Sequence, residues 1–383
     1  MSDINNRAVY ITRLSKFLPN DPVMNDEMED FIGQIKGQKS RSKSIILRSN
    51  GIKSRYYALD KNGKSTHTNY ELTYEAIKGL IGNGFTLKDI DLLSCGTTSP
   101  DQMLPSHASM VQGKLGCNSI EVISPAGSCN SGMLALKYGY LSVLAGMSKN
   151  AVCSGSEKIS TWIQSKNFGE EAERLEQLGK NPYLAFEKEF LRWMLSDGAA
   201  AVLLQKEPNL DELSLKIDWI EIKSYANEAD TCMCAGAVQK ENGELIPWRD
   251  LSQQEQMNSS VFTLRQDTRI LEKNITRFGA KFLVEVSEKH SFNPSETDYF
   301  LPHMSSEFFR KIIQKDSLDH GVEIPEEKWF TNLHKVGNVG SASAFLMLEE
   351  LYNSGKLKAG EKILIMVPES ARFSYAYMHL TVV

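Results

Sequence analysis

The sequence has neither an excess of basic residues nor a long apolar run. Its 43 lysines and arginines are outnumbered by 48 aspartates and glutamates, which gives a formal net charge of −5 at pH 7. Proteins that bind nucleic acid usually carry clustered positive charge, so this balance argues against a nucleic-acid partner. The longest stretch without a charged side chain, Val122–Leu136, has only 15 residues and contains Pro, Ser and Gly. It is too short and too polar to cross a bilayer, so we expect no membrane span.

Cysteine is also scarce, and its spacing is typical of neither a disulfide framework nor a metal site. The six cysteines are Cys95, Cys117, Cys129, Cys153, Cys232 and Cys234. Only Cys232 and Cys234 form a close pair, and a zinc site built from such pairs needs a second one. Residues Met1–Asn6 lack the apolar core of an export signal. We therefore expect free thiols, no metal ion and a cytoplasmic protein.

The remaining composition is that of a folded chain in which helices and strands alternate. An apolar fraction of 41% provides a full core and excludes disorder. The expected helices span residues 71–83, 106–115, 130–145, 305–314 and 341–352, and the expected strands span 90–95, 120–123, 151–154, 199–204, 298–301 and 362–367. This alternation favours an α/β fold. We expect two similar halves, residues 1–205 and 206–383, with a charged helical insertion at about residues 160–192 that is either a surface helix or a lid.

Residues 36–55 form a strongly basic segment in an otherwise acidic chain. The segment contains seven lysines and arginines and no acidic residue. Such a run is either a solvated surface or a docking site for an anionic partner. Because the rest of the chain is acidic, that partner would be local, such as a phosphate group or an acidic carrier protein.

The segment Ser124–Gly132 places a thiol where a strand gives way to a helix. The strand candidate ends at Ile123, small residues follow, and Cys129 opens a helix that is apolar on nearly every side. A helix of this composition is buried. The unpaired N–H groups at its start and the positive end of its dipole favour a thiolate over a thiol. This context predicts that Cys129 is a nucleophile, whereas the other five cysteines are interpreted as inert thiols.

Two further residues are candidate partners for a nucleophilic thiol. His303 follows the strand candidate in Leu301-Pro302-His303. Asn338 lies between Gly337 and Gly340, and glycines allow the backbone to approach a ligand closely. A nucleophilic cysteine needs neighbouring groups that handle protons and developing charge, and both residues suit that role. His334, close to Asn338 in the sequence, is a rival histidine.

Taken together, these motifs resemble the β-ketoacyl-ACP synthase III branch of the thiolase superfamily over nearly the whole chain. Several ordered motifs are far more specific than any one of them. The matching segments are Ile46–Arg55, Gly96–Asp101 with Pro105-Ser106, the Cys129 turn, Ser196–Ala201, Leu301–His303 and Gly337–Ser343. Ser196 stands where the family's Gly-Asp-Gly-Ala turn has its first glycine.

The resemblance implies a fold, an acyltransferase activity and a set of roles. The fold would be the thiolase fold, five αβαβα layers with two pseudo-duplicated halves, and the chain would form a homodimer. Cys129 would take an acyl group from a thioester, and its own N–H with a second amide would hold the oxyanion. His303 and Asn338 would hold the carbonyl oxygen of the second substrate as an enolate forms. The substrates would be thioesters of coenzyme A or of acyl-carrier protein, with no free cofactor and no metal.

The chain departs from the family pattern at its C-terminal loop. The family's glycine-rich loop supplies the second amide, but Val367–Phe373 contains no glycine. The N–H of Ser370 or of Ala371 would have to replace it. The same loop carries Glu369 and Arg372, which are either a surface salt bridge or groups with a chemical role.

This departure, with the segment Phe190–Gly198, resembles a narrower subgroup, the ketosynthase/cyclases that make dialkylresorcinols and the bacterial stilbene precursor. Such an enzyme joins two acyl thioesters, one of them a 3-oxoacyl thioester, and closes a cyclohexanedione-type ring. Ring closure needs a further base, for which Glu157 is a candidate; a surface or dimer-contact glutamate is the alternative. Arg48, Lys53 and Arg55 would meet a carrier protein or the phosphates of coenzyme A.

Three other functions stay open at this point. An ordinary synthase III would use malonyl-ACP and make a linear 3-oxoacyl-ACP. A thiolase-fold acyltransferase or thioester hydrolase would use the same Cys129 without condensation. The third is a catalytically inactive subunit that supports an active partner. The presence of all three residues of a Cys–His–Asn set argues against this role.

Overall fold

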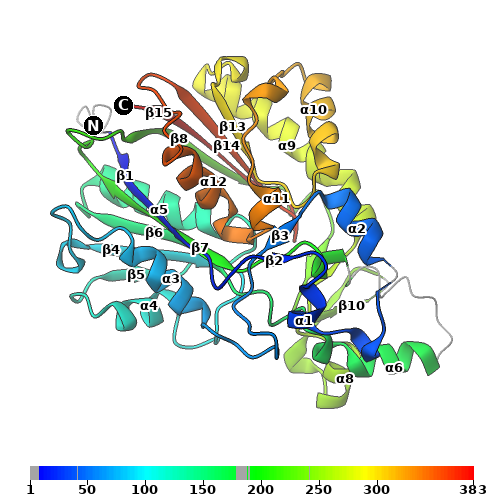
Figure 1. The fold of residues 1–383 in the computed structure, drawn as a ribbon. Helices are drawn as coiled ribbons and strands as arrows, with labels where there is room; N and C mark the ends of the chain where they lie inside the picture. Colours follow the sequence, from blue (N-terminus) through cyan, green and yellow to red (C-terminus); the bar gives the residue numbers. More distant parts are fainter. Residues whose placement is uncertain (1–7, 41, 178–187, 189, 241) are drawn as a thin grey trace.

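The computed structural model describes residues 8–40, 42–177, 188, 190–240 and 242–383. Within these ranges one nine-stranded sheet dominates, in the order β13-β14-β15-β8-β1-β7-β6-β4-β5 (Figure 1). Its strands are β1 (Tyr10–Phe17), β4 (Leu92–Thr97), β5 (Glu121–Ile123), β6 (Ala151–Glu157), β7 (Gly198–Gln205), β8 (Leu215–Ser224), β13 (Tyr299–Pro302), β14 (Lys362–Glu369) and β15 (Ser374–Val382).

Shorter strands and the helices complete the described chain. The short pairs are β2 (Val23–Met24) with β3 (Ser54–Arg55), β9 (Met233–Cys234) with β12 (Arg265–Gln266), and β10 (Ala237–Gln239) with β11 (Leu245–Pro247). The helices are α1 (Met28–Ile32), α2 (Lys43–Asn50), α3 (Asn69–Lys78), α4 (His107–Leu115), α5 (Ser131–Ala145), α6 (Gly169–Gln177), α8 (Gln253–Asn258), α9 (Thr268–His290), α10 (Phe308–Asp319), α11 (Leu333–Val336) and α12 (Ser343–Tyr352). None of these helices is both long and apolar enough to span a bilayer.

The strand pairing repeats between the two ends of the sheet. In the first half β4 pairs parallel with β6, β6 antiparallel with β7, and β7 antiparallel with β1. In the second half β13 pairs parallel with β14, β14 antiparallel with β15, and β15 antiparallel with β8. Strands β4, β6, β7 and β1 therefore correspond to β13, β14, β15 and β8. The halves join where β1 pairs with β8 through only Tyr10 and Ile11.

Helices cover both halves of the sheet and also lie between them. Helices α3 and α4 pack on the first half, α9 packs on β14 and β15 of the second, and α10 packs against α9. Helix α5 packs on β4 and β6, and α12 packs on strands of both halves, so these two form the central layer (Figure 1). The result is the α/β thiolase fold that the sequence predicts.

Glycines permit the close contact between the two central helices. A side chain on Gly132, in the first turn of α5, would place its Cβ 2.3 Å from the carbonyl oxygen of Ser341. A side chain on Gly155, in β6, would approach the same oxygen equally closely. Real Cβ atoms do not tolerate such distances, so both positions require glycine if the start of α12 is to lie against the start of α5.

Most predicted elements are present, with shifted ends. The helix expected from residue 305 begins at Phe308, and the one expected at 71–83 ends at Lys78. The helix expected at 341–352 begins at Ser343, because Ser341 lies in a preceding 3₁₀ turn, and it ends at Tyr352 as predicted. Part of the insertion expected at 160–192, residues 178–187 and 189, lies outside the described residues.

Asp197 is a buried structural carboxylate in the Ser196-Asp197-Gly198 turn. Its Oδ1 accepts hydrogen bonds from the N–H groups of Ile159 (2.7 Å) and Ser160 (2.9 Å). Its Oδ2 accepts from the N–H of Ala58 (2.7 Å) and from the Ser160 hydroxyl. Removing such an acceptor leaves buried donors unpaired. The turn also matters for the site, since the Ser196 N–H donates to the carbonyl of Asn338 (2.9 Å).

Replacing Asp197 by alanine is therefore expected to lower the free energy of unfolding by about 3 kcal/mol or more. Urea denaturation followed by circular dichroism measures this change. Asp211→Ala, at an exposed position, is the matched control and should change the value little. A loss in Asp197→Ala no larger than in the control would show that this hydrogen-bond cluster does not stabilise the turn.

Candidate active site

Cys129 lies in the turn that leads into α5. Ser128 and Asn130 on either side are buried, and Cys129 itself is partly buried against the core. The Ser131 N–H donates to the carbonyl of Ser128 (2.9 Å), which closes the turn immediately before the helix. The thiol thus lies two residues before the first helical residue, close to the position that the sequence predicts.

His303 is placed by the end of β13. Its N–H donates to the carbonyl of Met366 on β14 (2.8 Å), so the sheet fixes the backbone at this residue. The side chain is only 4% exposed, and burial lowers the pKa of His303 to about 4. The imidazole is therefore neutral at pH 7, with one nitrogen as donor and the other as acceptor.

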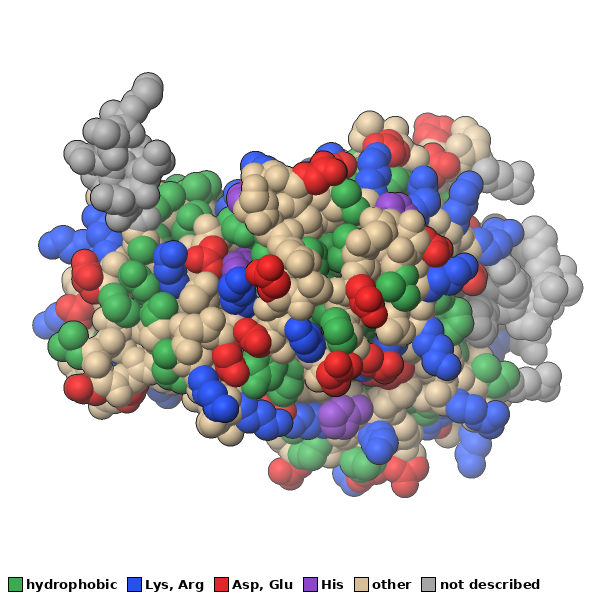
Figure 2. Space-filling view, turned by 90° about the horizontal axis from the view of Figure 1, so that it is seen from above, with side chains coloured by type: hydrophobic (Ala, Val, Ile, Leu, Met, Phe, Trp, Pro, Cys, Tyr) green, Lys and Arg blue, Asp and Glu red, His purple; other side chains and the backbone are tan. Residues whose placement is uncertain are grey.

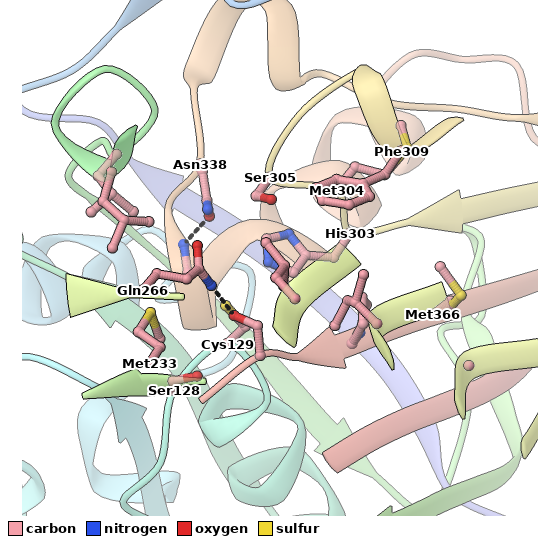
Figure 3. Close-up of a pocket in the computed structure, with 18 of the residues that line it drawn as sticks. Ser128, Cys129, Met233, Gln266, His303, Met304, Ser305, Phe309, Asn338 and Met366 are labelled. Atoms are coloured by element: carbon pink, nitrogen blue, oxygen red, sulfur yellow. Dashed lines mark hydrogen bonds between the residues drawn. The ribbon is translucent and has the colours of Figure 1, made fainter. Parts of the chain in front are cut away.

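Asn338 is held by its backbone and by its own side chain. Its N–H donates to the carbonyl of Met194 (3.0 Å). Its Oδ1 accepts from the N–H of Gly340 (2.9 Å), a bond drawn in Figure 3. Gly337 and Gly340 have φ of 71° and 49°, the left-handed region that favours glycine. Because Oδ1 is engaged, the side-chain NH₂ is the group that remains to donate to a ligand.

The three side chains line one cavity. The lining of this cavity includes Cys129, His303 and Asn338 together with Glu157 and Ser370. Figure 3 shows Cys129, His303 and Asn338 around a common space. Residues far apart in sequence, from the starts of α5 and α12 and the end of β13, are thus brought together at the junction of the two halves.

The protonation state of Cys129 differs from the sequence-based expectation of a thiolate. Burial, together with the negative charges of Glu369 and Glu157, raises the pKa of the Cys129 thiol to about 12. Loss of hydration and two nearby carboxylates outweigh the favourable helix N-terminus. The resting group is therefore a thiol at pH 7, and its proton must leave as the sulfur attacks.

Glu157 is buried at the end of β6, so the interpretation as a surface glutamate is wrong. Its Oε1 accepts from the N–H and the hydroxyl of Thr98 (3.0 and 2.6 Å) and from the N–H of Ser341 (3.2 Å). Its Oε2 accepts from the hydroxyl of Ser99 (2.6 Å). Burial raises the pKa of Glu157, while these hydrogen bonds act in the opposite direction. The carboxylate lines the cavity and also joins the end of β4 to the start of α12.

The loop after β14 places Ser370 at the cavity. The Ser370 hydroxyl accepts a hydrogen bond from Nε2 of Gln266 (2.9 Å), and both residues line the cavity (Figure 3). The N–H of Ala371 donates to Oε1 of Glu369 (2.6 Å). Of the two amides considered for an oxyanion site, that of Ala371 is thus already engaged, which leaves Ser370 as the candidate.

The predicted surface salt bridge between Glu369 and Arg372 is not what the structure shows. Glu369 is 6% exposed and accepts from the hydroxyl of Ser128 (2.6 Å). The Arg372 side chain is exposed and points elsewhere, donating to the carbonyl of Ala226 and the hydroxyl of Thr231, each at 3.3 Å. Glu369 therefore contacts the turn that contains Cys129, and its position in the sequence does not reveal this contact.

The basic segment divides into exposed and buried residues. Arg48, in the last turn of α2, and Lys53 are exposed. Arg55 is fully buried, and its guanidinium donates to Oδ1 of Asn25 (2.8 Å), so this side chain is unavailable to a phosphate, contrary to the prediction. Arg41 lies outside the described residues. On the face seen in Figure 2, basic and acidic side chains are interspersed.

Other parts of the lining carry no sequence motif. Gln266 on β12 and Met233 on β9 come from short strands that the sequence does not predict. Helices α9 and α10 supply an apolar wall, which consists of Leu271, Ile275, Gly279, Ala280, Phe309 and Ile313. Cys95, Cys117, Cys129 and Cys153 are free thiols, and among the residues described no group of His, Cys, Asp or Glu is arranged to hold a metal ion.

Comparison with known proteins connects this geometry to characterised enzymes. Residues 287–370 match the family model of the 3-oxoacyl-[acyl-carrier-protein (ACP)] synthase III C-terminal domain. The β-ketoacyl-[acyl-carrier-protein] synthase III of Clostridium perfringens is 26% identical over 351 residues, 91% of this chain and 92% of the relative. That of Helicobacter pylori strain P12 is 24% identical and covers 92% of both chains.

Solved structures share the fold across the whole chain. OleA of Xanthomonas campestris matches with a TM-score of 0.75 at 18% identity and covers 98% of both chains. AbyA1, a tetronic acid condensing enzyme, matches with a TM-score of 0.73 at 18% identity, covering 97% of this chain and 99% of its own. The chain thus has the thiolase fold of these enzymes and is similar to synthase III along its length, and it is an acyltransferase of the condensing type.

Proposed function

We propose that this enzyme joins two acyl thioesters, one of them a 3-oxoacyl thioester, and closes the product to a cyclohexanedione-type precursor of dialkylresorcinols or stilbenes. The observation that supports it is the cavity shared by Cys129, His303 and Asn338. These are a nucleophile and two donors suited to developing negative charge. The chain's relatives named synthase III support the condensing step.

In the first step Cys129 accepts an acyl group. Its sulfur attacks the carbonyl of the donor thioester, and the oxyanion that forms is held by the N–H groups of Cys129 and Ser370. The tetrahedral adduct collapses with loss of the donor thiolate, which takes up the proton released by the cysteine. The product is an acyl-Cys129 thioester and a free carrier or coenzyme A thiol.

In the second step a carbon–carbon bond forms. A 3-oxoacyl thioester loses a proton from the carbon between its two carbonyl groups, and His303 and Asn338 donate to the enolate oxygen. For a cyclohexanedione product, the acyl group on Cys129 must carry a 2,3-double bond. The enolate carbon adds to carbon 3 of that acyl group, and carbon 2 of the same group takes up the proton, so the joined chain stays on Cys129. A neutral His303, as its low pKa provides, keeps the ring N–H that such a donor needs.

Ring closure requires space and a further base. The cavity lined by Cys129 is also lined by the apolar wall of α9 and α10, which suits hydrocarbon or aryl arms. A solved OleA structure of the same fold contains lauric acid and lauroyl-CoA. Glu157 lines the cavity, and its burial raises its pKa toward neutrality, as a general base requires. A second enolate, formed by this base at carbon 4 of the 3-oxoacyl unit, would attack the acyl-Cys129 carbonyl. This closes a six-membered ring, and the Cys129 thiolate leaves and takes up the proton.

The substrates are proposed to arrive on coenzyme A or on an acyl-carrier protein. Arg48 and Lys53 are exposed near the His303 loop, since the carbonyl of Ser49 accepts from the hydroxyl of Ser306 (3.3 Å). Their charge would complement phosphates or an acidic carrier surface. We also propose a homodimer, because β5 is an edge strand of the sheet and Leu141 on α5 and Met147 after it are 48% and 73% exposed.

A product assay tests the proposed function. Purified enzyme is incubated with an acyl-CoA and a 3-oxoacyl thioester, and the products are identified by mass spectrometry. A cyclic product carrying both arms is the expected result. A linear 3-oxoacyl product, formed when malonyl-ACP is supplied, would support the alternative of an ordinary synthase III, which the curated relatives favour. Free acid alone would show a hydrolase and contradict condensation.

Replacing Glu157 by glutamine separates ring closure from condensation. We expect the cyclic product to fall by about 100-fold, while the first carbon–carbon bond still forms, because loss of a general base costs about that factor. The ratio of cyclic to linear product, measured by mass spectrometry, reports the effect. If both products fall together, Glu157 only holds the ends of β4 and β6 against α12. Glu75→Gln, at the solvent-facing Lys78 pair, is the control.

A further inference from the structure

Two buried glutamates occupy equivalent positions in the two halves of the fold. Glu157 is the last residue of β6, and Glu369 is the last residue of β14. These strands correspond, since each pairs parallel with one neighbour (β4 or β13) and antiparallel with the other (β7 or β15). Both carboxylates are at least 94% buried, with exposures of 2% and 6%. A buried carboxylate persists only where donors surround it.

Each glutamate contacts the loop that precedes the central helix of the opposite half. Glu157, in the first half, accepts from the N–H of Ser341, two residues before α12. Glu369, in the second half, accepts from the hydroxyl of Ser128, three residues before α5. The two contacts are reciprocal, and both cross the junction where the cavity lies. The contact made by Glu369 is the one next to Cys129.

Glu369 also organises the loop that carries Ser370. Its two carboxylate oxygens accept from the N–H groups of Ala371 (2.6 Å), Arg372 (3.4 Å) and Ser374 (3.3 Å). The Ser374 hydroxyl donates to Glu369 (3.2 Å) and accepts from Nδ2 of Asn130 (2.6 Å). Both neighbours of Cys129 are therefore tied to this loop, Ser128 directly and Asn130 through Ser374.

These bonds explain how the loop forms without glycine. The chain turns between β14 and β15 with Phe373 at a φ of 60°, a conformation that a bulky residue adopts only when its surroundings impose it. A single carboxylate that binds three consecutive or near-consecutive N–H groups imposes such a turn. Ser370 thus keeps its place in the lining of the cavity that Cys129 also lines, although the glycines are absent.

We propose that Glu369 is a positioning residue that holds the Cys129 turn and the Ser370 amide as one unit. This inference rests on the proposed function in that it takes Cys129 as the nucleophile. Glu369 touches no reacting atom; it acts through Ser128, through Ser374 and through the backbone of its own loop. An oxyanion site is effective only if its donors are fixed before the charge develops.

The carboxylate also affects the thiol electrostatically, which gives a readout that a purely structural residue would not change. The titratable groups around the thiol are Glu369 from the end of β14, Glu157 from the end of β6 and the neutral His303 just after β13. A negative charge near a thiol disfavours its thiolate form. Removing the charge of Glu369 should therefore lower the pKa of Cys129, while loosening the site.

The test uses Glu369→Gln in the full-length enzyme, with two measurements. The pH profile of Cys129 alkylation by iodoacetamide, followed by peptide mass mapping, should move to lower pH by about half a unit or more. The kcat for transfer of an acyl group from acyl-CoA should fall about tenfold or more, with KM nearly unchanged, because the defect lies in the transition state. Glu296→Gln removes a surface carboxylate at the other end of β14, paired with Lys362, and should change neither value.

Two further variants keep the proposal open to refutation. If Glu369→Gln does not fold, Ser128→Ala breaks only the contact to the nucleophile turn and should lower kcat in the same way, and Glu369→Asp should restore part of it. An alkylation profile and kcat indistinguishable from those of Glu296→Gln, or an unchanged kcat in Ser128→Ala, would overturn the proposal. Alkylation does not depend on condensation, so a failure of the proposed function is recognised separately, by the absence of acylated Cys129 in the wild-type enzyme.

Discussion

Replacing Cys129 by alanine is expected to abolish covalent acylation and to reduce product formation by about 1,000-fold or more, because the acyl-enzyme cannot form. The structure places the Cys129 sulfur in the cavity that His303 and Asn338 also line. The other cysteines differ: Cys95 and Cys153 are fully buried within the sheet and its core, where burial raises the pKa of each thiol. They are thus poor substitutes as nucleophiles.

Intact-protein mass spectrometry after incubation with an acyl-CoA measures this result. The wild-type enzyme should gain the mass of one acyl group, and Cys129→Ala should gain none. Cys117→Ala is the matched control, since Cys117 is partly exposed but is outside the cavity lining, and it should acylate normally. An acyl mass that persists on Cys129→Ala would place the nucleophile elsewhere.

Replacing His303 by alanine is expected to leave acylation intact while reducing condensation by about 100- to 1,000-fold. The expectation follows from the roles of the two groups of donors. The amides of Cys129 and Ser370 serve the acyl carbonyl, whereas the His303 imidazole serves the enolate of the second substrate. Because burial lowers the pKa of His303 to about 4, its N–H form should be constant from pH 6 to 9, and so should its contribution.

Acylation and condensation can be measured separately in this variant. Protein mass gives the acyl-enzyme, and product mass gives the new carbon–carbon bond. His334→Ala is the control: that side chain is exposed and outside the cavity lining, so both steps should proceed. Loss of acylation in His303→Ala would instead identify His303 as the base that takes the Cys129 proton. Such a base is a real alternative because the raised pKa of Cys129 keeps the resting group a thiol.

The fold could be predicted from sequence where the pattern is local. The strand at Ala199–Leu204 and the apolar helix after Cys129 are strong periodic signals, and both are present as β7 and α5. Helix α9 is not among the predicted elements, although Leu271, Ile275, Phe278, Phe282 and Val286 repeat at helical spacing between the charged residues of this 23-residue helix. Tertiary contacts also move helix ends, as at Ser341, which lies against Gly132 and Gly155, so that α12 begins at Ser343 rather than at residue 341.

The site could be predicted only in part, for the same reason. Cys129, His303 and Asn338 stand beside strand ends and glycines, which local sequence reveals. Glu369 and Ser128 are 241 positions apart, so their hydrogen bond depends wholly on the fold. The protonation state of Cys129 could not be read from its helix alone, because it depends on burial and on Glu157 and Glu369. Arg55 gives a second example: the sequence shows that residues 36–55 are basic, but it does not show that Arg55 is buried in the core.

The most direct test of the central claim is a crystal structure of the enzyme after reaction with an acyl-CoA. The account predicts a thioester on the sulfur of Cys129, its carbonyl oxygen between the amides of Cys129 and Ser370, and its acyl chain along the wall of α9 and α10. His303 and Asn338 should face the open side of that carbonyl. An acyl group on any other residue, or one on Cys129 with both His303 and Asn338 turned away from it, would contradict the account.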